Sequence, residues 1–116
     1  MRQYMLLLYA NETAGQSLAP EDISYWMKKM GDYSEALKKA DAFVGTAGLG
    51  LTSDARTIHA TKDELQVHNG PYADTQEQLG GYFMIRAADM DAAQAWAAKC
   101  PAALWGHIEI REISHG

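Results

Sequence analysis

Cysteine is nearly absent from this sequence, and long hydrophobic runs are missing altogether. Cys100 is the one cysteine among 116 residues, so an internal disulfide cannot form. No apolar run approaches the roughly 18 residues that a membrane-spanning helix requires. Residues 1–9 also lack the small-residue cleavage site of a secretory signal. We therefore expect a cytoplasmic protein with no membrane partner.

Basic residues are few as well. The chain has 10 Lys and Arg against 15 Asp and Glu, for a net charge of −5. Affinity for nucleic acid comes mainly from clustered Lys and Arg, and only Lys28-Lys29 and Lys38-Lys39 approach a cluster. Nucleic acid is therefore not an expected partner. The 47% hydrophobic and 22% charged content is ordinary for one globular domain spanning residues 1–116.

The sequence lacks the common motifs for metals, phosphates and nucleophiles. It has no H-x-H, C-x-x-C or H-E-x-x-H spacing, and no G-x-S-x-G elbow. Gly45, Gly48 and Gly50 do not open a helix, as a phosphate-binding loop would. We expect neither a metal nor a cofactor. Cys100 precedes Pro101 at the end of an alanine-rich segment, which is typical of a buried structural thiol.

Strand and helix patterns alternate along the chain. Residues 4–9 and 82–86 are apolar on both parities, whereas 106–111 alternate strictly and predict a half-polar edge strand. Apolar residues at three- and four-residue spacing after Pro20 predict an amphipathic helix with Trp26, Met27 and Met30 in the core. The other expected elements are a strand at 43–51, a hairpin of 56–60 with 65–68, and a helix at 90–99 capped by Asp89.

Without the hairpin, this order is the ferredoxin-like split βαβ arrangement, an α+β fold with an antiparallel sheet and two helices on one face. The first and third core strands are then central, and these are the two segments that are apolar on both parities. Two helices cover only one face of such a sheet. A large uncovered apolar face is not tolerated in a monomer, so we expect a homodimer that joins the open faces as a dimeric α+β barrel.

The stretch from His68 to Gly81 combines turn residues with ionisable side chains. Asn69-Gly70 followed by Pro71 predicts a turn that ends the preceding strand. One interpretation of residues 74–81 is structural: Asp74 and Glu77 form a capping box, and Gly80-Gly81 end a short helical turn. That interpretation leaves His68 and Tyr72 unexplained.

The alternative is a catalytic loop in which His68, Asp74 and Glu77 transfer protons, since histidine exchanges protons near neutral pH. Tyr72 would stack on a planar ligand, and Arg111 on the last strand would hold an anionic group. The competing interpretation of Glu109-x-Arg111 is an ion pair, either solvated or at a dimer interface. A histidine at the start of a strand, such as His107, is typically a surface residue without a functional role.

Four separated motifs follow one another along the chain: Tyr4 to Tyr9 with Glu12, Asn69 to Gly81, Ala92 to Pro101, and Gly106 to Arg111. Together they resemble the YCII-related family, in the branch named for its DGPF motif. The sequence departs from that family's pattern at Asn69, Tyr72 and Gln76, where an aspartate, a phenylalanine and a lysine are usual.

The resemblance implies a dimeric α+β barrel with an active-site cleft, and it adds Glu12 to the ligand-binding candidates. Family members are mostly uncharacterised. Some are linked to the breakdown of chlorinated aromatics, as with a dehydrochlorinase, and DGPF relatives are associated with extracytoplasmic-function sigma factors. Relatives of the shorter YCII branch carry a catalytic histidine–aspartate pair whose histidine lies on the first helix. No histidine occurs between Pro20 and Asp41 in this sequence, so that pair cannot be assigned here.

Two functional hypotheses emerge from these patterns. The first is a lyase, isomerase or dehydrohalogenase that uses acid–base residues of the 68–81 loop on a small planar or anionic molecule. The second is a non-catalytic dimeric ligand-binding or regulatory module linked to sigma-factor systems. A catalytic Glu77 should meet another titratable group within about 3 to 4 Å, whereas a capping Glu77 points back to the Asp74 amide.

Overall fold

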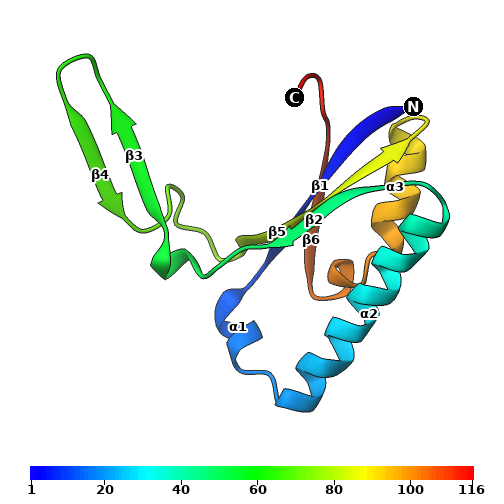
Figure 1. Cartoon of the computed structure of the whole chain (residues 1–116). Helices are drawn as coiled ribbons and strands as arrows, with labels where there is room; N and C mark the ends of the chain where they lie inside the picture. The colour runs from blue at the N-terminus through cyan, green and yellow to red at the C-terminus, as the bar shows by residue number, and fades with distance from the viewer.

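A four-stranded sheet in the order β2-β5-β1-β6 forms the body of the computed structural model, which describes residues 1–116 (Figure 1). Every neighbouring pair in it is antiparallel. Two helical crossovers, through α2 and α3, give the ferredoxin-like α+β order that the sequence predicted. In chain order the elements are β1 (Arg2–Ala10), α1 (Glu12–Gln16), α2 (Pro20–Lys39), β2 (Phe43–Gly48), η1 (Thr52–Asp54), β3 (Arg56–Ala60), β4 (Leu65–Asn69), β5 (Gln78–Ala87), α3 (Met90–Lys99), η2 (Pro101–Leu104) and β6 (Gly106–Glu112).

Strands β1 and β5 are central, as their apolar sequences predicted. Burial along β5 alternates: Phe83 and Ile85 are buried, and Tyr82 and Met84 are half-buried. The buried parity faces the helices, where the rings of Tyr33 and Phe83 meet edge to face at 5.1 Å. The core comprises Tyr4, Leu6, Tyr33, Leu37, Ala42, Phe83, Ile85, Ala87, Ala93, Ala97, Cys100 and Ala102.

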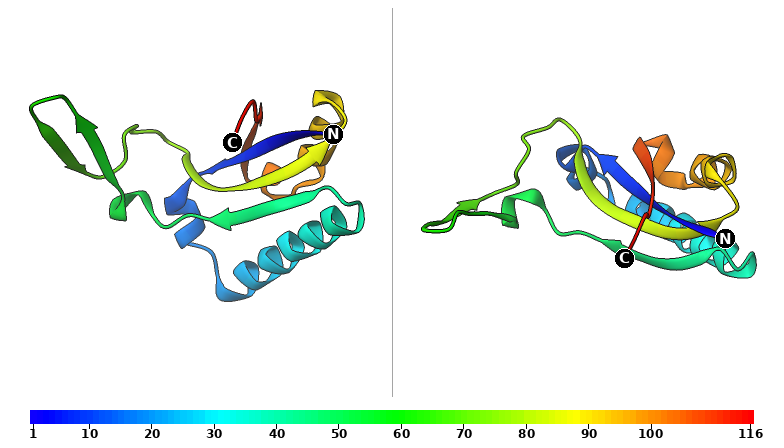
Figure 2. Two further views of the ribbon diagram at one scale, coloured as in Figure 1. Left: turned by 45° about the horizontal axis from the view of Figure 1, so that its top comes forward. Right: turned by 90° about the horizontal axis from the view of Figure 1, so that it is seen from above.

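The opposite parity forms the open face of the sheet, which no helix covers (Figure 2). On β1 it carries Met5, Leu7 and Tyr9, and on β5 it carries Tyr82 and Met84. These side chains are half-buried because they cover only one another. The sheet therefore has one packed apolar face and one uncovered face whose centre, on β1 and β5, is apolar.

Helix α3 begins and ends as the sequence predicted. Asp89 Oδ1 accepts the backbone N–H of Ala92 at 2.9 Å, and Pro101 follows the last turn. The Tyr33 hydroxyl donates to the carbonyl oxygen of Trp96 at 2.7 Å, which satisfies one of the carbonyls exposed at the helix end. Cys100 is 1% exposed, so the prediction of a buried structural thiol is confirmed.

Helix α2 follows the prediction only in its C-terminal half. It begins at Pro20 with acidic residues in the first turn, and only Tyr33 and Leu37 are buried. Ile23 is 40% and Met27 is 70% exposed, so the expected core position of Met27 was wrong. In Figure 1 the N-terminal half of α2 runs away from the strands, so its apolar face has no sheet to pack on.

Two local features differ from the elements that the sequence predicted. The segment after β1 contains a short helix, α1, whose N-terminus is capped by Asn11 Oδ1 accepting the backbone N–H of Ala14 at 2.8 Å. Asn11 is a preferred capping residue, which explains why this polar segment is helical rather than a plain loop. Strand β2 ends at Gly48 and not at Leu51, because the chain then turns into η1.

Strands β3 and β4 form the predicted hairpin, a separate two-stranded sheet that projects from the body (Figure 1). We call residues 56–69 the arm. At its base the Gly70 N–H donates to the Ala55 carbonyl at 2.7 Å, and the Thr57 hydroxyl donates to the Gly70 carbonyl at 2.9 Å. Gly70 has a φ of 129°, which favours glycine and confirms the turn predicted there. The arm therefore has a fixed base and a free end.

Alkaline pH should destabilise the protein through Tyr33 and Cys100. Burial raises the pKa of both groups above their ordinary values of 10.0 and 9.0. Folding favours their protonated forms, so this contribution to stability is complete below the ordinary pKa values and is lost as the pH rises from those values through the raised ones. We expect the free energy of unfolding in urea to fall above about pH 9, and Cys100→Ala to reduce the fall between about pH 9 and 10. A stability that is flat up to pH 11 would contradict this.

Candidate functional site

Residues 71–77 form an irregular connection with bends but no helical turn, so the predicted capping box is wrong. Strand β5 begins at Gln78, and Gly80 and Gly81 lie inside it instead of ending a helix. The connection is held by Asn11 Nδ2, which donates to the carbonyl of Gln76 at 3.1 Å. The Gln78 side chain donates to the Thr75 carbonyl at 2.6 Å. These bonds hold the irregular segment in place and leave the Glu77 side chain free for another partner.

That partner is His107 at the start of β6. Glu77 Oε1 lies 2.7 Å from His107 Nδ1, a charge-assisted hydrogen bond at the short end of its range. The Glu77 side chain is 33% exposed and that of His107 is 82% exposed. With an ionised Glu77 as acceptor, Nδ1 carries the proton and Nε2 presents a lone pair to solvent. A carboxylate that orients an imidazole in this way is a common acid–base arrangement.

Tyr9 and Glu109 lie beside this pair. Tyr9 is opposite His107 in the β1–β6 ladder, so the two side chains share the open face. The Tyr9 hydroxyl donates to Glu109 Oε1 at 3.3 Å. Desolvation raises the pKa of Tyr9, Glu109 adds to the rise, and Arg111 opposes it. Tyr9 therefore stays protonated near neutral pH and can donate a hydrogen bond.

A β-bulge brings Glu77 to this face. The β1–β5 register shifts between Leu8 and Tyr9, so that Leu8 is opposite Gly81 but Tyr9 is opposite Leu79. Gly80 is the extra residue, and it reverses the parity of everything before it in β5. Glu77 consequently lies on the side of the sheet where His107 projects.

The other residues predicted for the site are dispersed. His68 lies on β4 at the base of the arm, and Asp74 and Tyr72 lie in the connection, with Tyr72 93% exposed. None of these three side chains forms a hydrogen bond within the chain. Arg111 is opposite Met5 on the open face and is exposed. The structure thus brings Glu77 and Arg111 to one face, together with Tyr9, His107 and Glu109.

Glu12 has a local structural role. Its Oε1 accepts the backbone N–H of Thr52 at 2.9 Å, and its Oε2 accepts the Thr52 hydroxyl at 2.7 Å. The Glu12 backbone N–H donates to the Gln78 side chain at 2.9 Å. Both carboxylate oxygens are thereby used to fasten η1, the turn that leads into the arm.

Sequence reasoning missed His107, Tyr9 and Glu109 as site residues. The strict alternation of 106–111 placed His107 and Glu109 on one face, and that is the signal that was available. Within one chain Glu109 and Arg111 form no ion pair, and Glu109 accepts a hydrogen bond from Tyr9; the interfacial ion pair stays a prediction.

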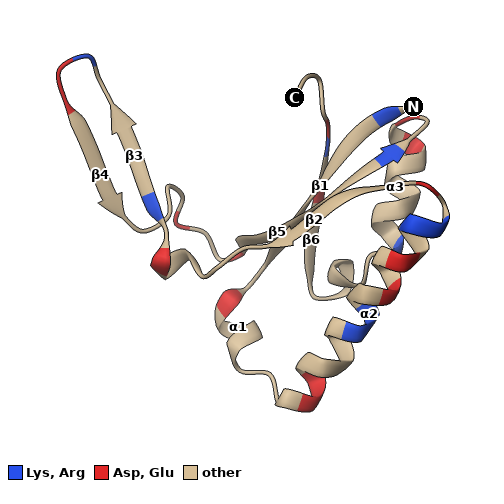
Figure 3. Ribbon diagram, viewed as in Figure 1, with Lys and Arg blue, Asp and Glu red and all other residues tan.

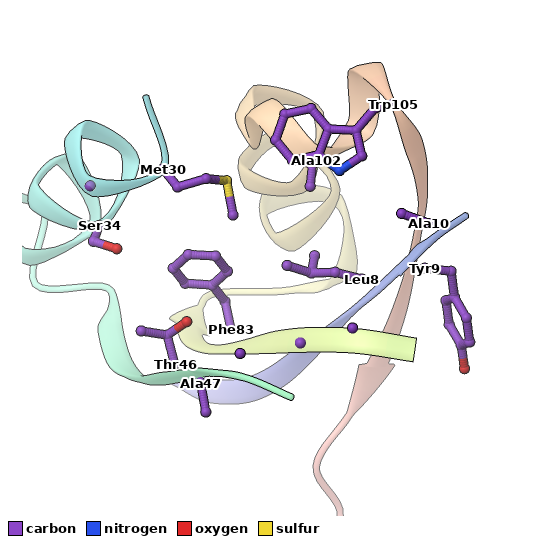
Figure 4. Close-up of a pocket in the computed structure, with 14 residues that line it drawn as sticks. Leu8, Tyr9, Ala10, Met30, Ser34, Thr46, Ala47, Phe83, Ala102 and Trp105 are labelled. Atoms are coloured by element: carbon purple, nitrogen blue, oxygen red, sulfur yellow. The ribbon is translucent and has the colours of Figure 1, made fainter. Parts of the chain in front are cut away.

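An apolar groove lies on the other side of the sheet, between α2 and the strands. Its inner part has a volume of about 350 Å³, and Met30, Phe83 and Trp105 project into it, whereas the Tyr9 ring points away (Figure 4). Its outer part has a volume of about 700 Å³ and is walled by residues including Leu18 and Ile23. No carboxylate, histidine, lysine or arginine lines either part. The groove can enclose an apolar molecule, but it carries no acid–base group.

Charges and metal ligands give no further site. Lys and Arg are scattered over α2, the strand ends and the arm (Figure 3). No three His, Cys, Asp or Glu side chains are grouped as a metal site would require. None of the helices is both long and apolar enough to cross a membrane.

Comparison with known proteins identifies the family. The model of the YCII-related domain matches residues 2–115, nearly the whole chain. The chain belongs to the YCII-related family. This YCII-related protein is also similar to an uncharacterised protein of Rhizobium meliloti (strain 1021), with 29% identity over 113 residues that cover 96% of this chain and 91% of the relative. The family is thus established, and the chemistry has to be argued from the site.

Proposed function

We propose that this YCII-related protein is a homodimeric enzyme that moves a proton on a small planar or anionic molecule, with Glu77 and His107 as its acid–base pair. The observation that carries the proposal is the 2.7 Å contact between Glu77 Oε1 and His107 Nδ1. The reaction would be of the lyase, isomerase or dehydrohalogenase type. We further propose that the chain belongs to the branch named for the DGPF motif, through Asn69-Gly70-Pro71-Tyr72.

The proposed roles are based on the bonds already made. Glu77 holds the His107 ring, so that Nε2 removes a proton from the substrate and returns it to the product. Tyr9 donates a hydrogen bond, and Arg111 binds an anionic group on the same face. His68, Asp74 and Tyr72 form no side-chain hydrogen bonds in one chain. We therefore assign the proton transfer predicted for His68 and Asp74 to His107 and Glu77, and we keep Tyr72 as a proposed ligand contact.

The surface area supports the homodimer. The chain exposes 8210 Å², whereas a compact monomer of this length exposes about 6,300 Å². The excess of about 1,900 Å² is within the range that one partner of an obligate homodimer buries, about 1,000 to 2,500 Å². The half-buried open face is the largest uncovered part of the sheet, and pairing two such faces would enclose the Glu77–His107 pair.

The test begins with a ligand. Small planar acids, phenols and halogenated aromatics are screened for a rise in melting temperature, and each compound that binds is followed by NMR for conversion. We expect Glu77→Gln and His107→Asn each to lower kcat for a converted compound at least about 100-fold. The Glu77 variant loses the carboxylate that orients the imidazole, and the His107 variant loses the general base itself. Glu64→Gln and His59→Asn, which make the same changes on the arm, serve as controls. Turnover that survives Glu77→Gln would remove Glu77 from the mechanism.

The apolar groove favours a second candidate, a non-catalytic ligand-binding module. Trp26 and Trp105 meet edge to face at 4.8 Å in the groove wall, so a bound aromatic should change tryptophan fluorescence. We expect Ile23→Lys to weaken the binding of 2-naphthol at least about 10-fold, because it places a charge in an apolar wall. Tyr25→Lys, on the same helix but outside the groove, is the control. Equal affinities for the two variants would exclude the groove as the binding place.

A further inference from the structure

The arm has two chemically different faces. Residues directly opposite in an antiparallel pair share a face, so Ile58 with Val67 and Ala60 with Leu65 lie on one side. Arg56 with Asn69 also lies on this side, at the base of the arm, and the rest of the side is apolar. It is solvent-exposed in one chain: Ile58 is 57%, Val67 55% and Leu65 64% exposed. The other side carries two polar pairs, Thr57 with His68 and His59 with Gln66.

Such an arm needs a surface to pack on. An isolated two-stranded hairpin is marginally stable in water, and every residue of β4 is exposed. The arm does not find that surface on its own chain. Its base is fixed by the Gly70 and Thr57 hydrogen bonds, and both oxygens of Glu12 fasten the turn before it. Figure 2 shows the arm directed away from the sheet and the helices in two further views.

The shape of the chain indicates what supplies the surface. The radius of gyration is 16.1 Å, whereas about 13 Å is expected for a compact domain of this length. The exposed area exceeds that of a compact monomer by an amount typical of one side of an obligate homodimer. Ile58, Leu65 and Val67 on the arm are exposed, and Met5, Leu7, Tyr82 and Met84 on the open face are only half-buried.

We propose that the apolar face of the arm docks on a second copy of this chain, so that two arms are exchanged across the two-fold axis. This extends the proposed homodimer and does not depend on catalysis at Glu77 and His107. The polar face of the arm, with His59 and His68, then stays in solvent. Each subunit contacts its partner through two surfaces, the open sheet face and the arm.

The test compares the same substitution on the two faces of β4. Val67→Lys should raise the dimer dissociation constant, measured by sedimentation equilibrium, at least about 100-fold, because each dimer would bury two added charges. Gln66→Lys, on the polar face, should change it less than about threefold. Both positions are exposed in one chain, so circular dichroism should show folded subunits, and Ile58→Lys repeats the test at the opposite strand.

A second measurement follows the arm directly. In a dimer mixed from ¹³C-labelled and unlabelled subunits, isotope-filtered NMR should detect contacts from the Ile58, Leu65 and Val67 methyl groups to the other subunit. An intact dimer without such contacts, or a Val67→Lys dimer as tight as the unmodified one, would overturn the proposal. A monomeric unmodified protein would overturn it too. Neither measurement uses a substrate, so failure of the proposed catalytic function is detected separately, by the turnover of Glu77→Gln.

Discussion

Replacing Gly106 with alanine should destabilise the sheet by at least about 2 kcal/mol, the cost of a group for which the packed structure has no space. A Cβ at this position would lie 1.9 Å from the Tyr9 carbonyl oxygen and 3.2 Å from the Ala10 Cα. Neither is a flexible side-chain end, so the backbone of β6 must move away from β1. The ladder would separate where Tyr9 faces His107, and the Glu77–His107 contact would be lost with it.

Urea unfolding followed by far-UV circular dichroism measures this effect. Gly45→Ala is the matched control, because nothing lies within 4 Å of its added Cβ, and it should stay within about 0.5 kcal/mol of the unmodified protein. Gly81→Ala should fall between the two, since its Cβ would lie 2.8 Å from the Ala47 carbonyl oxygen. If Gly106→Ala does not fold, Gly81→Ala still allows a crowded glycine position to be compared with the uncrowded position of Gly45. Equal stabilities for the Gly106 and Gly45 variants would show that β6 is not held as closely as described.

Met84→Lys should convert the proposed homodimer into folded monomers, raising the dissociation constant at least about 1,000-fold. Met84 is half-buried on the open face, opposite Met5 on β1 and Gly45 on β2. Lysine has nearly the same length as methionine, so a single chain should accommodate it with its amine in water. Two facing sheets would instead bury two ammonium groups in an apolar interface.

The measurement is sedimentation equilibrium over a wide range of protein concentration. Met90→Lys makes the same change at an exposed position on α3 and should leave the dissociation constant unchanged. A Met84→Lys protein that remains dimeric would place the interface elsewhere. A dimer that survives Met84→Lys but dissociates with Val67→Lys would assign the contact to the arm alone.

Much of the fold could be predicted because the signals are local. The residues of β1 and β5 are apolar on both parities, and this fixed them as central strands before any contact was known. Asp89 and Pro101 mark the ends of α3 by capping and by the loss of a backbone donor. Helix α2 shows the limit of this reasoning. Its apolar spacing is correct, but the presence of a surface opposite Ile23 and Met27 depends on the length of the sheet and not on the helix itself.

The site was predicted less well because its contacts are distant in sequence. Asp74-x-x-Glu77 satisfies the capping-box pattern, but hydrogen bonds from Asn11 and Gln78 hold the segment in an irregular, non-helical conformation. Nothing in the sequence indicates that the Asn11 and Gln78 side chains bond to this segment. His107 is 30 residues from Glu77, and its position at the start of an edge strand is compatible with plain surface. Only the register of three strands brings the two together.

The bulge at Gly80 has a consequence for how this family can vary. Side chains on a strand alternate, and a bulge absorbs one residue without moving the strand beyond it. Deleting Gly80 would leave Gly81 opposite Leu8 and Leu79 opposite Tyr9, so Glu77 would still lie on the same side as His107. A homologue that is one residue shorter at this point is therefore expected to keep the acid–base pair, and a gap there is no sign of a different activity.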